Sequence, residues 1–182
     1  MTTNQNPDRR AVGVPPAVRA AATAAKLTAP VRRSAARAAA GDLVTAAGDT
    51  YARRIVLVTT VHDDGLIACR VAHNCPEMAT DHDLIVDPAE SGYPCRLVIC
   101  GELHVTIGPA QALEIVGRVP RAAAEAVRLA TVTDAESLDG HPSGLPLGGI
   151  GDPRRRFLTD ELPDVQDLAA PMIRERVWPD LP

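Results

Sequence analysis

Apolar residues in the middle of the chain come in short runs that are separated by polar turns. The runs are rich in Val, Ile and Leu, and their length is typical of buried strands. They predict five strands, over residues 54–60, 66–72, 83–87, 95–107 and 114–119. Because Asp64-Gly65 separates the first two runs, we expect a hairpin there. The pattern therefore predicts a compact β-module that begins near Gly41-Asp42.

A helix is predicted directly after the last strand. Pro120 suits the first turn of a helix. Residues 121–131 place Ala124 and Val127 on one side and charged residues on the other, as in an amphipathic helix. The fold class expected is therefore α+β with a mainly β core.

Two segments of different character flank this module. Residues 17–39 are Ala-rich and predict one or two helices broken near Pro30. After the module, residues 139–153 read as a Gly- and Pro-rich linker, and we expect a short helix near 164–176. This tail is too poor in large apolar residues for a core of its own, so it should pack on the module or on a partner chain. The expected organisation is a basic N-terminal arm (1–40), the β-module (41–132), and a linker with an extended tail (133–182).

Composition limits the class of protein. The chain has 182 residues, of which 46% are hydrophobic, enough for one domain with a core. It contains no apolar run of about eighteen residues and no export signal that we identify, so we expect no membrane span and a cytoplasmic location. The four cysteines are then expected to be free thiols.

Charge is distributed unevenly. Residues 1–40 carry seven Lys and Arg against one Asp, a net +6, and because the whole chain has −4, the remainder carries −10. A basic arm on an acidic body indicates either a polyanionic partner or attraction between the arm and the body.

Six short motifs in the module follow one another in a specific order. They are Gly41-Asp42, Arg54-Ile55-Val56-Leu57-Val58, the run from Leu66 to Asn74, Leu84-Ile85-Val86-Asp87, Glu102-Leu103-His104, and Gly117-Arg118-Val119 before the helix at Pro120. In this order they resemble the MazF/PemK family of toxin endoribonucleases over residues 41–131, about half of the chain. The resemblance implies a small SH3-like β-barrel with a C-terminal helix, commonly paired as a homodimer.

The same resemblance implies metal-free cleavage of single-stranded RNA by the ribose 2′-hydroxyl, within a toxin–antitoxin pair. Arg54 matches the family's catalytic Arg, with Arg53 beside it, and a guanidinium suits the charge of the phosphate transition state. The family's catalytic hydroxyl falls near Ala72, where His73 or Asn74 would have to substitute for it.

Two histidines indicate a catalytic role by an argument that does not depend on the family resemblance. His73 and His104 lie on strands that could be neighbours, and a pair of His side chains across a groove can serve as general base and acid. The catalytic candidates are thus Arg54, His73 and His104, and the RNA-binding candidates are Arg53, Asn74 and Glu102. The common structural alternative for each is a solvated or hydrogen-bonded surface residue, with Glu102 paired to an Arg such as Arg70.

Metal and cofactor sites are not expected. The Cys and His residues between 69 and 100 lack the paired Cys-x-x-Cys spacing of a zinc site. A flavin-binding split barrel is a third possibility, but the chain has almost no aromatic residues to stack on the flavin ring.

Two functions therefore remain in competition. The first is an RNA-cleaving toxin-like barrel, whose partners would be single-stranded RNA and an antitoxin-like protein or another copy of the chain. The second is a catalytically degenerate barrel that acts as a binding or assembly module, indicated by Ala72, Glu102 and His104. The first requires Arg54 and both imidazoles to share one open groove, whereas an arm that fills this groove favours the second.

Overall fold

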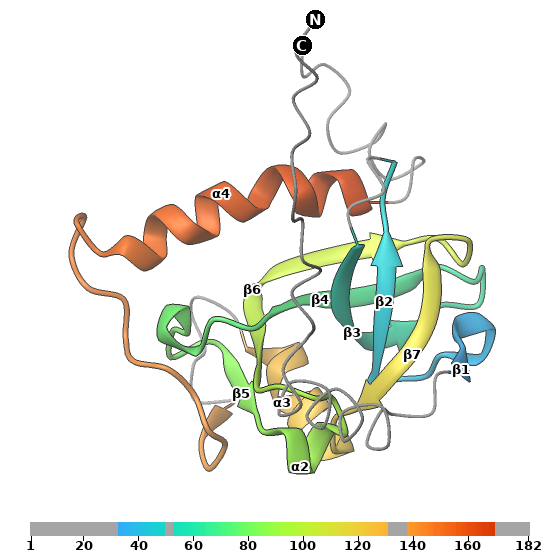
Figure 1. Ribbon diagram of the computed structural model, residues 1–182, viewed down its shortest axis with the longest axis horizontal. Helices are drawn as coiled ribbons and strands as arrows, with labels where there is room; N and C mark the ends of the chain where they lie inside the picture. Colours follow the sequence, from blue (N-terminus) through green and yellow to red (C-terminus); the bar gives the residue numbers. More distant parts are fainter. Residues whose placement is uncertain (1–32, 50–52, 131–137, 170–182) are drawn as a thin grey trace, which may run out of the picture.

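The architecture is seen in a computed structural model, which describes residues 33–49, 53–130 and 138–169 (Figure 1). In these residues seven strands form one sheet, in the order β1-β7-β2-β3-β4-β6-β5, and every pairing is antiparallel. The strands are β1 Arg33–Ser34, β2 Asp42–Ala47, β3 Arg53–Val61, β4 Ile67–His73, β5 Leu84–Val86, β6 Leu97–Ile107 and β7 Ala112–Arg118.

The hairpin between β3 and β4 forms where the sequence predicts it. Gly65 has a φ of 83°, which glycine adopts without a steric cost. The amide of Leu66 donates to Asp64 Oδ1 at 3.0 Å. Each of the five predicted strands is present within a few residues of its expected bounds.

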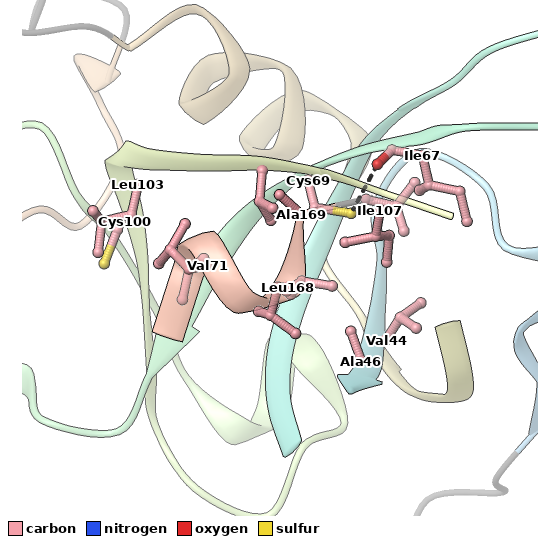
Figure 2. Close-up of a cluster of buried hydrophobic side chains, with 14 of the residues drawn as sticks. Val44, Ala46, Ile67, Cys69, Val71, Cys100, Leu103, Ile107, Leu168 and Ala169 are labelled. Atoms are coloured by element: carbon pink, nitrogen blue, oxygen red, sulfur yellow. Dashed lines mark hydrogen bonds between the residues drawn. The ribbon is translucent and has the colours of Figure 1, made fainter. Parts of the chain in front are cut away.

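The sheet buries apolar side chains on both faces, because neighbouring residues of a strand point to opposite sides. Along β3, Val56 and Val58 join one cluster and Leu57 joins the other. The first cluster is completed by helix α4 (Pro153–Leu168), whose Leu168 lies among residues of the sheet in Figure 2. The second is covered by helix α3 (Arg121–Leu129). In Figure 1 the two helices accordingly lie on opposite sides of the sheet.

Two predictions about the flanking segments are wrong where the structure describes them. The C-terminal helix begins earlier than the predicted 164, since α4 starts at Pro153, with Asp152 as its N-cap accepting from the amide of Arg154. Residues 164–168 are helical as expected, and residues 170–176 of the predicted span lie outside the described residues. Residues 33–37 are not α-helical either. They form β1, which pairs with β7, and a short 3-10 turn, η1 (Ala35–Arg37). The predicted helices before residue 33 lie outside the described residues.

The fold class is α+β with a mainly antiparallel sheet and few helices, as expected. Short helical turns at η2 (Pro76–Met78) and α2 (Pro88–Ser91) interrupt the chain on either side of β5. The arrangement is compatible with a barrel-like core, but within the described ranges the edge strands β1 and β5 do not pair with each other. The sheet is therefore open.

Candidate functional site

Arg54 lies at the start of β3, on the face of the sheet that α4 covers. Its Nη1 lies 3.3 Å from Glu161 Oε2, and its Nη2 donates to Asp164 Oδ2. Both carboxylates belong to α4 and are spaced by three residues, which places them on one side of the helix. The candidate catalytic cation is therefore already neutralised by two acidic side chains of its own chain.

His73 is brought to the same face. Ile55 pairs with Ala72 across β3 and β4, so Arg54 and His73 are neighbours on adjacent strands. The imidazole packs edge-on against Phe157 of α4, with ring centroids 4.7 Å apart. We call Arg54, His73, Glu161 and Asp164 the Arg54 site.

The protonation of His73 is set by its surroundings. Burial lowers its pKa, and Arg54 lowers it further against the opposing effects of Asp83, Glu161 and Glu77. Its Nδ1 accepts a hydrogen bond from the amide of Cys75 at 3.1 Å, so in the neutral ring the proton resides on Nε2. That Nε2 is buried and has no hydrogen-bond partner. In this tautomer neither ring nitrogen is free to accept a proton as a general base.

His104 lies on the other face of the sheet, and the expectation of one shared groove is wrong. The strands are neighbours as predicted, since β4 pairs with β6, but His104 lies opposite Arg70 in the register. Arg70 points to α3, where its Nη2 donates to the carbonyl oxygens of Arg128 and Ala130 at 3.0 and 3.4 Å. The spacing of three residues between Arg70 and His73 puts them on opposite faces, because the side-chain period of a strand is two.

His104 instead contributes to a separate groove of about 540 Å³ on the α3 face. Glu102, Arg70 and Arg128 line the same groove. The imidazole is exposed, and its Nδ1 lies 3.2 Å from the carbonyl oxygen of Glu102. Burial and the nearby charge of Arg128 lower the pKa of Arg70, whose guanidinium is used to bind the C-terminal end of α3.

The candidate RNA-binding residues are not gathered in one place. Arg53 is exposed at the first position of β3 and alternates to the side away from Arg54. Asn74 is exposed just after β4. Glu102 lies at the junction of the α3-face groove and a second groove of about 650 Å³ between β6 and α4. No Arg70–Glu102 ion pair is seen among the described residues.

Glu161 and Asp164, which complete the Arg54 site, were not predicted from the sequence. Their signal was present: Asp152-Pro153 is a favourable start for a helix, and Phe157, Glu161, Val165 and Leu168 follow helical spacing. Glu161 and Asp164 occupy positions of this helix that face Arg54. These two acidic residues interrupt the apolar stripe by which an amphipathic helix is recognised.

Metal ligation and membrane insertion find no support in the described segments. There, no group of three or more His, Cys, Asp and Glu side chains is arranged to hold a metal ion. The four cysteines are free, and burial raises the pKa of Cys69 to about 12. In the same ranges no helix has the length and apolar character needed to cross a bilayer.

No family model matches the chain, and no curated protein matches it either.

Proposed function

We propose that this protein is a non-catalytic binding or assembly module built on a MazF/PemK-like, SH3-like barrel. On this proposal the Arg54 site binds an acidic helix, and in the structure α4 is that helix. The observation that carries the proposal is the contact of Arg54 with both Glu161 and Asp164. A phosphate would have to displace two carboxylates from the guanidinium before it could bind.

The chemistry of the face agrees with binding better than with catalysis. Attack by a 2′-hydroxyl needs a base, a charge-stabilising cation and an acid within one cavity. His104 is on the far face, and the lone pair of His73 Nδ1 is occupied by the Cys75 amide. Ala72 supplies no hydroxyl. Arg54 thus lacks the partners that strand cleavage requires.

Endoribonuclease activity is the second candidate, favoured by the proximity of Arg54 and His73 on one face. On that alternative Arg54 would bind the scissile phosphate once α4 had released it, and the protein would act as a toxin-like ribonuclease. An antitoxin-like protein or another copy of the chain would then be its partner.

One assay separates the two functions. A long single-stranded RNA is incubated with the wild-type protein, with the Glu161→Gln/Asp164→Asn variant that frees Arg54, and with the same variant carrying Arg54→Ala. The binding module leaves the RNA intact in all three reactions. New RNA ends that appear with the double variant and vanish with Arg54→Ala would establish the ribonuclease and overturn our proposal.

A further inference from the structure

Helix α4 supplies part of the core as well as the carboxylates of the Arg54 site. Val165, Leu168 and Ala169 are 7%, 1% and 2% exposed and pack in one cluster with residues of β2, β3, β4 and β6 (Figure 2). Without α4 that face of the sheet would be exposed to water at a large cost. The face must therefore be covered by an α4 helix. The α4 of a second copy of the chain has the same sequence, so it fits this face equally well.

The connection into α4 is suited to opening. The four residues before the N-cap are Gly148-Gly149-Ile150-Gly151, and nothing lies within 4 Å of the position of an added Cβ at Gly149 or Gly151. Opening there would break the hydrogen bonds of Arg154 to the carbonyl oxygens of Leu145 and Pro146. These two bonds are exposed, so water can replace them at little cost. The partly buried bond of Arg154 to the carbonyl oxygen of Ala79 would also break on opening.

Apolar side chains without cover lie around this connection. Ile150 is 100% exposed, Leu145 is 75% exposed, and Leu162, which lines the groove between β6 and α4, is 44% exposed. When two copies exchange an identical element, their connecting segments run beside each other and form a new contact. Ile150 belongs to that segment and Leu145 lies just before it, so exchange would bring the exposed side chains of two copies together.

We propose that a second copy of this chain is the partner of the Arg54 site. Two copies exchange their α4 helices, so that Arg54 of each binds Glu161 and Asp164 of the other. This inference rests on the proposed binding function and names the partner of the same site. The ion pairs and the core contacts of α4 are the same in the exchanged pair as in the closed copy, and only the connection over residues 147–151 changes conformation.

Complementary charge reversal tests the exchange. One variant carries Arg54→Glu and the other carries Glu161→Lys/Asp164→Lys, so each alone places like charges at the Arg54 site. When the two are co-expressed with different tags, each face meets the α4 of opposite charge only in the mixed pair. We expect a one-to-one heterodimer by native mass spectrometry, enriched at least about tenfold over either homodimer, as expected from restoring a few charge-assisted contacts. Co-expressed chains that are recovered only as monomers would overturn the inference.

Two controls keep the outcome interpretable if a single variant folds poorly. A chain with all three substitutions restores the opposite charges within one copy, and it should fold and lose the preference for a mixed partner. Deletion of Gly149 and Ile150 from the otherwise natural chain shortens the connection and should shift the protein to dimer, because a short hinge favours exchange. A deletion variant that stays monomeric at every concentration tested would also contradict the exchange.

The failure of this inference differs from the failure of the proposed function. If Arg54→Glu leaves the hydrogen-exchange protection of α4 unchanged, Arg54 does not hold the helix and the proposed function fails. If that protection falls but no heterodimer forms, the Arg54 site binds α4 only within its own copy, and only the exchange is wrong.

Discussion

Replacement of Arg54 by Ala should destabilise the protein through the carboxylate that it leaves behind. Glu161 is 16% exposed, and its Oε2 is buried without a hydrogen-bond partner. The positive charge of Arg54 therefore balances the negative charge of this carboxylate. A buried polar group left without its partner costs about 1–3 kcal/mol, and a charged group costs at least as much. Asp164 is 43% exposed, and an ion pair this open to solvent adds about 1 kcal/mol or less.

A double-mutant cycle isolates this effect. Glu161→Gln removes the charge, so in the Arg54→Ala background it should recover about 1 kcal/mol or more of the free energy of unfolding, whereas in the wild-type background it should be destabilising. Urea unfolding followed by far-ultraviolet circular dichroism gives the four free energies. Arg53→Ala is the matched control, and because Arg53 is exposed its effect should stay within about 0.5 kcal/mol. If Glu161→Gln has the same effect in both backgrounds, Arg54 and Glu161 are not coupled and the reasoning is refuted.

Three other predictions concern the core and its titrating groups. Leu168→Ala should lower the free energy of unfolding by about 2–5 kcal/mol, since the side chain is 1% exposed; a loss below about 1 kcal/mol in urea would contradict the packing of α4. Burial lowers the pKa of His73 in the folded state, so the unfolded chain binds more protons below about pH 6.5 and stability falls as the pH drops. The urea midpoint of His73→Gln should fall less between pH 7 and pH 5, and an equal fall would rule out this role. A thiol reagent should modify two cysteines rapidly in the native protein, sparing Cys69 and Cys100, whose pKa values are raised by burial; rapid reaction of all four would contradict this burial.

The strands of the module were predictable because their signals are local. Short runs of Val, Ile and Leu, the Asp64-Gly65 turn and the Pro at position 120 each act within a few residues. The helix α4 was misplaced because its stabilising contacts are distant in sequence. Its Pro163 discourages a helix, and two of its inward positions are acids that face Arg54, 107 and 110 residues away.

The predicted site was wrong about the faces of the sheet on which its side chains lie, although it was right about which strands are neighbours. The sequence indicated that the strands of His73 and His104 could be adjacent, and they are. The face on which each side chain lies depends on the pairing register, because a shift of one residue moves every side chain of a strand to the opposite face. The pairing of β4 with β6 has a register shift between Arg70 and Ala72. Such an irregularity has no local signal in a run of apolar residues, so the separation of the two imidazoles could not be predicted.

The account rests on Arg54 holding the acidic side of α4. Hydrogen exchange of residues 153–168, measured by mass spectrometry on the full chain, tests this directly in Arg54→Ala and in the matched Arg53→Ala variant. We predict that exchange in this segment accelerates about tenfold or more in Arg54→Ala, as expected for the loss of more than about 1.4 kcal/mol of local stability, and stays at the wild-type rate in Arg53→Ala. Equal protection of α4 in all three proteins would contradict the account.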